Sequence, residues 1–500
     1  MIELLAFRNL ALRPWRSALL LVGYSLGVAV MIVLLSIGEA LLSQSRDEKL
    51  VGGGDVTILP EGIDIEVMKT GGLGGLFFSI DHSRFIDQQL LSAPRLAGEV
   101  AVVAPQIEGK LLYARLPNGR EVPVLASGEI PSKSAAVGAV PQIAAGAWSD
   151  DGLDRAWSDP QPDELRDAID HFHLPPSQAR GDSTWAEWHY FNVLSADGAS
   201  WAFVSFIVAG QVPNGKWGGE VLVTLHHTGR APRRFVATVP PSAVAFSTTH
   251  ANLSLGPSSV SVLADGRYAV RAHAHEEGDG APVDVELVVD PARGAFFPGA
   301  ALDSGDAVSG YVVPALRASA TGSICVADAC EQFARAQSYH DHNWGVWRGV
   351  TWDWGATRAG PYTILYGRVQ PADTTTVAQP LFAYVVDSLG FLTLFRPREI
   401  VYDDSRITPS GGSAVRVPAG AVLAAVRGDD TLRLELTIDD DAVTDMRRPG
   451  TRRGDAAGDR ALAKPFFVQM KGTARISGRV SGHPLAGSGA GFFETYRPPL

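Results

Sequence analysis

The chain has 500 residues, and a chain of this length is expected to fold into two to four domains. It contains 53 glycines and 32 prolines, a composition that favours many turns and short strands over long helices. The net charge of -11 argues against nucleic acid as a partner.

The first predicted element is a transmembrane helix. Residues 17–38 contain no charged side chain and are about long enough to cross a bilayer as a helix. The apolar run is too long for a secretory signal peptide, and no clean small-residue cleavage pattern follows it. Arg8, Arg13 and Arg16 precede the run, so the positive-inside rule places the N-terminus in the cytoplasm. We therefore expect a single-pass membrane protein with the bulk of the chain outside the cytoplasm.

Three regions are expected before the strand-rich part of the chain. Residues 1–45 comprise the cytoplasmic N-terminus and the transmembrane helix. Residues 46–140 are expected to form a small extracytoplasmic domain of strands with some helix, and the Asn118-Gly119 step between two apolar runs predicts a hairpin. Residues 141–180 are rich in Asp and Pro and are interpreted as a linker.

From residue 181 to the end, short strands of alternating polarity are separated by turn clusters. Such even spacing is typical of antiparallel barrels or sandwiches, and the length suggests two of them, 181–345 and 346–500. The fold class expected is therefore mainly β. The two cysteines, Cys325 and Cys330, either close a small hairpin disulfide or remain separate thiols.

The segment 339–345 reads YHDHNWG and holds the densest group of polar and aromatic side chains in the chain. In a strand, successive side chains point to opposite faces. One face then carries His340, His342 and Trp344, which combine proton-transfer groups with a large π surface. The other face carries groups that can anchor and orient them, namely Tyr339, Asp341 and Asn343. We expect the histidine face to line a cavity.

Three further stretches combine aromatic rings with a carboxylate: WAEWHYFN at 185–192, WDWG at 352–355 and GFFETY at 491–496. Their rings can line a ligand site or simply fill a core, and a buried carboxylate among them must be hydrogen-bonded. A structural role is expected before a catalytic one for Glu187 and Glu494. The residues that we assign to ligand binding or to a structural signature are Glu187, Trp188, Tyr190, Tyr339, Asn343, Trp352, Asp353, Trp354 and Glu494.

A metal site is not expected from the sequence. Three His-x-His pairs occur, and such a pair on a strand puts both rings on one face: His171/His173, His273/His275 and His340/His342. However, no carboxylate or third histidine stands at a recognisable spacing from any of them. There is also no nucleophile elbow, Walker loop or dinucleotide fingerprint, so no cofactor is expected.

The motifs EWHYFN, YHDHNWG, WDWG and GFFETY together resemble the AttH / carotenoid 1,2-hydratase (hydroxyneurosporene synthase, CrtC-like) family over about 165–500. The resemblance implies two lipocalin-like barrels in tandem that handle a hydrophobic isoprenoid or lipid-like molecule. The N-terminal sequence, up to about residue 135, resembles the first transmembrane helix and the start of the extracytoplasmic domain of macrolide-exporter-like ABC transporter permeases. Together these resemblances imply a protein of the bacterial inner membrane with its bulk in the periplasm.

Two functions are consistent with these resemblances. The first is a membrane-anchored AttH-like protein that binds or handles a hydrophobic ligand in association with an ABC transporter. The alternative is a hydro-lyase that adds water to an isoprenoid C=C bond, which needs an acid and aromatic faces to shield a cation. For that reaction the resemblance implies the catalytic set His340, Asp341, His342, Trp344 and Tyr366. The chain departs from the hydratase pattern at Arg368, a cation where a carboxylate is expected, and this favours the binding role.

Overall fold

The computed structural model describes residues 14–47, 56, 58, 80–92, 94–96, 98–137, 149–177, 179–278, 280–304, 307–347, 349–370, 380–410, 412–446 and 464–500. The arginines Arg8 and Arg13 and most of the segment 48–79 lie outside the described residues, and so do the expectations that rest on them. The helices are α2 (Pro14–Asp47), α4 (Ile80–Ser92), α5 (Pro131–Ala136), α6 (Gly152–Ser158), α7 (Pro162–Ile169) and the 3-10 turn η1 (Pro241–Ala243).

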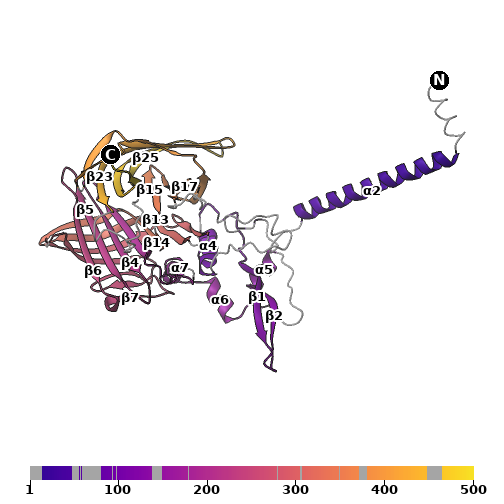
Figure 1. The fold of residues 1–500 in the computed structure, drawn as a ribbon, viewed down its shortest axis with the longest axis horizontal. Helices are drawn as coiled ribbons and strands as arrows, with labels where there is room; N and C mark the ends of the chain where they lie inside the picture. The colour runs from indigo at the N-terminus through magenta and orange to yellow at the C-terminus, as the bar shows by residue number, and fades with distance from the viewer. Residues whose placement is uncertain are drawn as a thin grey trace, which may run out of the picture. The chain divides into compact units, whose positions relative to one another are not determined.

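The chain divides into two compact units (Figure 1). One unit contains α2, α5 and a two-stranded hairpin, β1 (Gln106–Arg115) with β2 (Glu121–Glu129). The other contains α4, α7 and every later strand, so both large sheets belong to one unit. Residues 162–169 are helical, and the segment interpreted as a linker therefore contributes α7 to this second unit.

Helix α2 is a candidate membrane span. It is 34 residues long, or about 50 Å, and its apolar part, Pro14–Val33, is long enough to cross a bilayer. None of that part is buried against the rest of the protein. An N-terminal signal sequence shares this length and composition, so the helix fits either role.

The hairpin turn of the first unit forms where Asn118 and Gly119 predict it. Gly119 has a φ of 81°, a left-handed conformation that glycine adopts without steric cost. The side chain of Asn118 accepts a hydrogen bond from the backbone N–H of Arg120 at 3.0 Å. Strands β1 and β2 then pair antiparallel on either side of the turn.

Twelve strands form the first sheet among the described residues. They are β3 (Trp185–Leu194), β4 (Ser200–Gly210), β5 (Trp217–His227), β6 (Arg233–Val239), β7 (Val244–Phe246), β8 (Leu253–Leu255), β9 (Ser258–Val262), β10 (Tyr268–Glu276), β11 (Pro282–Pro291), β12 (Phe297–Ser304), β13 (Ala307–Val326) and β14 (Ala329–Val346). Pairing runs in the order β11-β13-β14-β3-β4-β5-β6-β10, and β10 pairs again with β11. The sheet therefore closes into an antiparallel barrel.

Nine strands of the second sheet pair in the order β18-β17-β16-β15-β25-β24-β23-β22-β19 within the described ranges. They are β15 (Thr351–Ala359), β16 (Tyr362–Gln370), β17 (Phe382–Asp387), β18 (Gly390–Phe395), β19 (Ile400–Asp403), β22 (Gly420–Arg427), β23 (Asp430–Asp445), β24 (Phe466–Val480) and β25 (His483–Arg497). A separate hairpin joins β20 (Arg406–Ser410) to β21 (Ser413–Val417). The expected fold class is confirmed: two curled antiparallel sheets in tandem, the first closed and the second a half-barrel.

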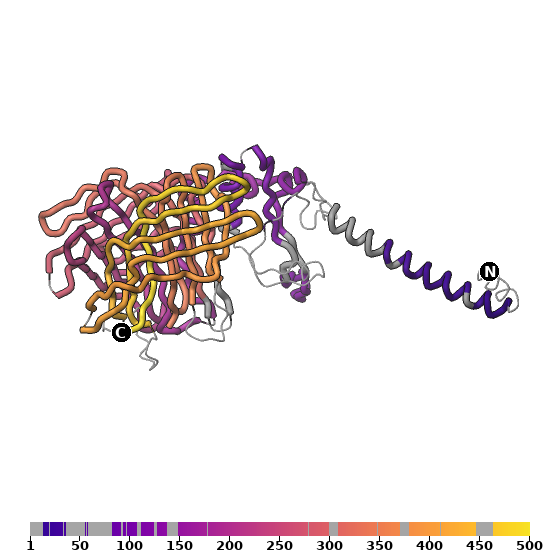
Figure 2. Tube along the Cα trace, turned by 90° about the horizontal axis from the view of Figure 1, so that it is seen from above, coloured from indigo at the N-terminus to yellow at the C-terminus, as the bar shows by residue number. Residues whose placement is uncertain are grey.

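The strands of the two sheets lie side by side in the second unit (Figure 2). Apolar side chains form a layer between the two sheets as well as a core inside each. All ten residues of β3 are buried, because the strand faces the barrel interior on one side and the second sheet on the other. Phe191 packs inside the barrel, whereas Tyr190 packs in the layer between the sheets. Burying one such aromatic ring contributes about 1.5–3 kcal/mol.

The two cysteines form a disulfide, which decides between the two alternatives left open by the sequence. Cys325 on β13 and Cys330 on β14 are paired across the turn that joins these strands. Their positions at the end of the hairpin follow from the register of the ladder.

Candidate functional site

The segment Tyr339–Gly345 lies on β14, and its side chains alternate as the sequence predicts. β14 pairs with β3 so that His342 lies opposite His189 and Asp341 lies opposite Tyr190. Because β14 has the barrel interior on one side and the second sheet on the other, each of its faces lines a different site.

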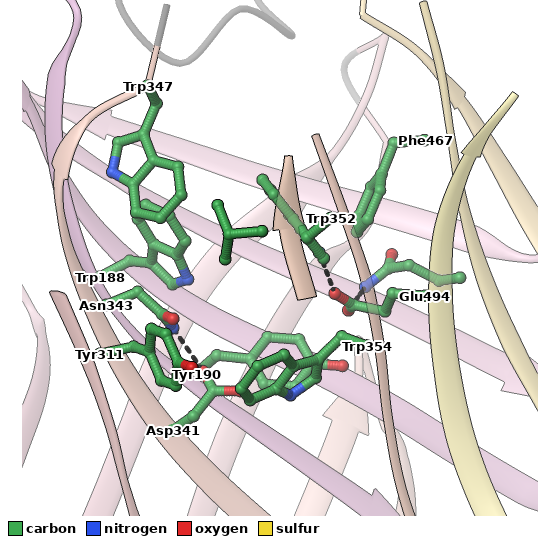
Figure 3. Close-up of a pocket in the computed structure, with 12 residues that line it drawn as sticks. Trp188, Tyr190, Tyr311, Asp341, Asn343, Trp347, Trp352, Trp354, Phe467 and Glu494 are labelled. Carbon is green, nitrogen blue, oxygen red and sulfur yellow. Dashed lines mark hydrogen bonds between the residues drawn. The ribbon is translucent and has the colours of Figure 1, made fainter. Parts of the chain in front are cut away.

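A pocket lies between the two sheets and is lined mainly by aromatic side chains (Figure 3). Its lining residues are Trp188, Tyr190, Tyr311, Asp341, Asn343, Trp347, Trp352, Trp354, Val369, Phe467, Gln469 and Glu494. The rings of Trp188 and Trp347 lie 4.7 Å apart, and that of Trp352 lies 6.2 Å from Trp188. The free space between these rings is about 40 Å³, so a larger occupant must move an indole side chain.

Two carboxylates line this pocket, and each is held by hydrogen-bond donors. Asp341 accepts from the amide of Asn343 at 2.7 Å and from the hydroxyl of Tyr339 at 2.7 Å. That hydroxyl in turn accepts from the indole N–H of Trp354 at 2.9 Å. Tyr339 and Asn343 therefore orient Asp341, whereas the sequence predicts that this face orients the histidines.

The second carboxylate of the pocket is Glu494 on β25. It accepts from the indole N–H of Trp352 at 2.9 Å and from the amide of Gln469 at 3.3 Å. Burial, and next the charge of Glu494 and that of Asp341, raise the pKa of the Tyr190 phenol well above its ordinary value. The pocket thus combines aromatic rings with two fixed carboxyl groups and a neutral phenol.

The second sheet holds Tyr366 and Asp353 on its inner face, away from the pocket. Tyr366 is fully buried in the core of that sheet, and its ring lies 6.3 Å from that of Phe493. Asp353 accepts hydrogen bonds from Arg368 at 2.8 Å and from Tyr402 at 2.8 Å. The cation at position 368 therefore compensates a buried carboxylate, and Tyr366 does not lie with the histidines of β14.

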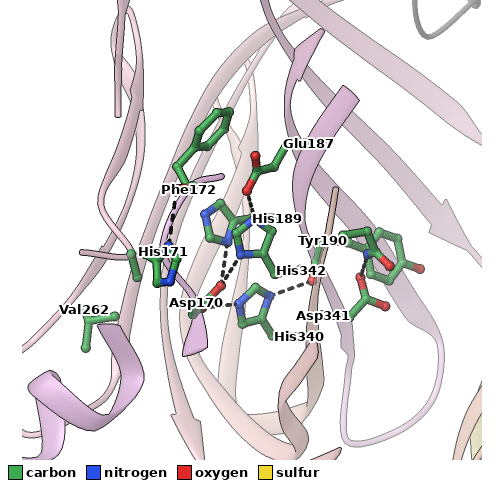
Figure 4. A network of polar contacts seen from close by, with 12 residues as sticks. Asp170, His171, Phe172, Glu187, His189, Tyr190, Val262, His340, Asp341 and His342 are labelled. Atoms are coloured by element: carbon green, nitrogen blue, oxygen red, sulfur yellow. Dashed lines mark hydrogen bonds and ion pairs between the residues drawn. The ribbon is translucent and has the colours of Figure 1, made fainter. Parts of the chain in front are cut away.

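The opposite face of β14 carries a buried network of histidines and carboxylates inside the barrel (Figure 4). Asp170, the C-cap of α7, lies at its centre with no exposed surface. Its carboxylate oxygens lie 2.9 Å from Nε2 of His340, 2.6 Å from Nδ1 of His342 and 3.3 Å from Nδ1 of His189.

Glu187 extends this network toward the barrel surface. Its carboxylate lies 2.9 Å from Nε2 of His342 and 2.9 Å from Nδ1 of His173, and it also accepts from the backbone N–H of His173 at 2.8 Å. The ring of Trp344 stacks on that of His173 with centroids 3.7 Å apart. Glu187 thus fixes the segment after α7 against β3 and β14.

Burial sets the charge states of this network. It lowers the pKa of His342 to about 3 and lowers that of His340, so both rings are neutral at pH 7. Burial and the charge of Asp170 raise the pKa of Glu187 well above its ordinary value. Burial acts on Asp170 in the same direction, but the neighbouring His340 and His189 outweigh it and hold the pKa of Asp170 well below that value.

The histidine face therefore does not line the pocket. His340 and His342 are fully buried in the network, and of the predicted catalytic set only Asp341 reaches the pocket. The sequence does not predict Asp170 and His189 as site residues. They meet His340 although 170 and 151 positions separate them from it along the chain. The one sequence feature that could have pointed to Asp170 is the His171/His173 pair, which follows it directly in the chain.

The remaining His-x-His pair lies on the surface. His273 pairs with Asp284 at 2.7 Å, and both side chains are 40% or more exposed. This pair is solvated and provides a natural comparison for the buried histidines.

No family model matches the chain, and no curated protein matches it. Among solved structures, the chain is similar to an AttH protein from Nitrosomonas europaea, with 15% sequence identity and a TM-score of 0.42. The match covers 65% of this chain and 97% of that protein. The chain is similar to kievitone hydratase from Nectria haematococca, with 14% identity, 66% and 94% coverage, and a TM-score of 0.39. It is also similar to CghA with Sch210972, with 13% identity, 63% and 89% coverage, and a TM-score of 0.38. None of these supports the resemblance to ABC permeases, which stays a prediction.

Proposed function

We propose that this protein binds a hydrophobic small molecule, a lipid or an isoprenoid, in the pocket between its two sheets. The observation that carries the proposal is the wall of four tryptophans, Trp188, Trp347, Trp352 and Trp354, around one space. Ligand pockets are typically apolar and aromatic with a few fixed polar groups, and this pocket has that composition. Indole rings offer large flat surfaces at a low cost in conformational entropy.

The polar groups of the pocket suggest how a ligand is oriented. Asp341 and Glu494 place two carboxylates in the pocket wall, and the donors around them hold each in a fixed orientation. A ligand with an apolar, unsaturated body and a hydroxyl or other donor at one end satisfies both kinds of surface. The small free volume means that Trp347 or Trp352, which are half-buried, must turn to admit it.

The alternative function, hydration of an isoprenoid C=C bond, is supported by the same carboxylates. Each ring face near a developing carbocation contributes about 0.5–2 kcal/mol of stabilisation, and an adjacent carboxylic acid can supply the proton. In this geometry the acid is Asp341 or Glu494 rather than a histidine, because His340 and His342 face the barrel interior. The binding function needs no proton transfer and is therefore the one we favour.

We further propose that the protein works at the outer face of a bacterial inner membrane, beside an ABC exporter. The support is the apolar helix α2 together with the N-terminal resemblance to exporter permeases. Cross-linking of the full chain in its native membrane, followed by mass spectrometry, is expected to recover an ABC transporter subunit. Release of the chain as a soluble, shortened protein would instead identify α2 as a cleaved signal.

The pocket is tested by ligand titration of the detergent-purified full chain. Squalene and oleic acid serve as probes, and quenching of tryptophan fluorescence reports binding. Trp352→Ala is expected to weaken binding at least tenfold, since it removes a ring from the pocket wall and the donor that holds Glu494.

Trp217→Ala is the matched control, because Trp217 is also half-buried but packs against the barrel core. Equal weakening in both variants, with near-UV circular dichroism unchanged, contradicts the proposed pocket. Recovery of squalene heavier by one water, dependent on Asp341 or Glu494, would replace binding by the hydratase alternative.

A further inference from the structure

We propose that Asp170, His189 and His340 bind a divalent transition-metal ion of the zinc class inside the first barrel. The three side chains offer one ligand atom each, and these atoms lie within 4.8 Å of one another. At most 1% of any of the three residues is exposed to solvent. The site lies on the opposite face of β14 from the aromatic pocket, so this proposal is independent of the proposed function.

The hydrogen bonding of His340 leaves a lone pair facing a carboxylate. Nδ1 of its ring lies 3.0 Å from the backbone carbonyl oxygen of Tyr190, which can only accept, so Nδ1 carries the ring proton. In the neutral ring Nε2 is then an acceptor, yet it lies 2.9 Å from Oδ2 of Asp170, also an acceptor. A proton or a metal ion must lie between them. Metal-bound histidines usually donate their other N–H to a backbone carbonyl or a carboxylate in this way.

His189 supplies a second, independent observation. Its Nδ1 is buried and has no hydrogen-bond partner within the described part of the chain, although it lies 3.3 Å from Oδ1 of Asp170. A buried imidazole nitrogen without a partner is costly and needs an explanation. Two ligands of one tetrahedral zinc ion, with bonds of about 2.0–2.1 Å, lie about 3.3–3.4 Å apart. A shared ion therefore accounts for the position of this nitrogen better than a hydrogen bond does.

Two neighbouring residues, Tyr268 and His342, belong to the surroundings of the ion. Tyr268, whose ring lies 4.7 Å from that of His340, has a buried hydroxyl that also lacks a hydrogen-bond partner among the described residues. Nδ1 of His342 lies 2.6 Å from Asp170, so His342 either orients the carboxylate or serves as a fourth ligand. Two or three imidazoles with one carboxylate form a donor set that suits zinc better than calcium or magnesium.

A second triad indicates where an ion can enter. The second triad consists of His173, Glu187 and His342, whose ligand atoms also lie close together. In it, however, Nδ1 of His173 and both ring nitrogens of His342 lie within hydrogen-bonding distance of a carboxylate. His173 is the member that reaches solvent, with 24% of its side chain exposed. We therefore place the ion at Asp170, His189 and His340, and assign the second triad to the approach from the surface.

The test uses the full chain in detergent, stripped of metal with a chelator. Addition of zinc is expected to restore one ion per chain by elemental mass spectrometry and to raise the melting temperature, because the ion binds the folded state. Cobalt in place of zinc is expected to give the intense visible bands of a tetrahedral N/O site. His189→Ala and His340→Ala should each lose the cobalt bands and weaken zinc binding at least tenfold.

His273→Ala is the matched control, since it removes a histidine of the exposed His-x-His pair and should leave the stoichiometry and the cobalt spectrum unchanged. If His340→Ala does not fold, His189→Ala decides, because the 3.3 Å contact of His189 with Asp170 is longer than those of His340 and His342. The proposal is overturned if zinc neither binds nor shifts the melting temperature of the folded wild-type chain, or if binding survives in the folded His189→Ala variant. In either case the cluster is a hydrogen-bonded network alone.

Discussion

Asp353 is a buried carboxylate whose counter-charge is Arg368, the residue that departs from the hydratase pattern. Asp353 is 4% exposed, and a buried carboxylate is costly unless its charge and its lone pairs have partners. Arg368 supplies the opposite charge, and Tyr402 and Thr495 supply hydroxyl donors at 2.8 and 2.7 Å. The position that departs from the hydratase pattern thus stabilises the second sheet.

Arg368→Met is expected to lower the free energy of unfolding by about 2–4 kcal/mol, because it leaves Asp353 buried without a counter-charge. Arg433→Met is the control: Arg433 pairs with Glu435 on the surface, where both side chains are more than 40% exposed, and its loss should cost at most about 0.5 kcal/mol. Urea unfolding of the two variants measures the difference. Equal, small losses would show that the hydroxyl donors alone compensate Asp353.

On two adjacent strands of the second sheet, an aromatic ring from each strand lies over a glycine of the other. Trp354 on β15 lies opposite Gly367 on β16, and Tyr366 lies opposite Gly355. A Cβ atom on Gly367 would lie 2.3 Å from the ring of Trp354, and one on Gly355 would lie 2.3 Å from the ring of Tyr366. Each glycine therefore gives a ring the space to lie flat across the neighbouring strand, one on each face of the sheet.

Gly367→Ala and Gly355→Ala form a matched pair that separates the pocket from the core. Each alanine must displace a ring, so each variant should lose about 1–3 kcal/mol of stability. Only Gly367→Ala moves Trp354, which lines the pocket, and only this variant should also weaken ligand binding. Thermal unfolding and the fluorescence titration measure the two effects; an equal loss of affinity in both variants would argue against the role of Trp354.

Strand β14 marks how far the sequence predicts the site. Alternation correctly placed His340, His342 and Trp344 on one face and Tyr339, Asp341 and Asn343 on the other. It did not predict which face meets the pocket, because both faces of β14 are buried here and hydrophobic alternation distinguishes only a buried face from an exposed one. The partner Asp170 could not be predicted, since it comes from a segment that looks like a polar linker and meets β14 only through the tertiary fold.

At the scale of the whole molecule, polar contacts join the barrel to the half-barrel. Asp440 on β23 accepts from the indole N–H of Trp201 on β4 at 3.1 Å and lies 3.5 Å from Nδ1 of His226 on β5. The side chain of Arg358 on β15 donates to the backbone of Ala318 on β13. Individual strands were predictable from their alternation, but these contacts depend on pairings between distant segments, which periodicity does not specify.

Asp440 makes the contacts between the barrel and the half-barrel sensitive to acid. Burial acts to raise the pKa of Asp440, but the contacts from His226 and from the indole of Trp201 outweigh it and lower that pKa below 3.8. A carboxyl whose folded-state pKa is lowered stabilises the protein above its ordinary pKa, and this contribution is lost as the pH falls below 3.8. Asp440→Asn should therefore be less stable than the wild type at pH 7, by about 1 kcal/mol or less, and the difference should shrink as the pH falls toward 2. Urea unfolding at both values checks this; a difference that persists at pH 2 would exclude charge as its cause.

The barrel is closed by its shortest ladder, in which β6 and β10 share two residue pairs, His275 with Val236 and Glu276 with Phe235. Next to these pairs, Arg233 binds Glu276 through two hydrogen bonds of 2.9 and 2.7 Å. Separating such a short ladder breaks few backbone hydrogen bonds, so a local opening here costs far less than global unfolding. Exchange between the barrel interior and solvent then depends on the β6–β10 ladder as well as on the buried network, and it can change without any change in the residues of that network.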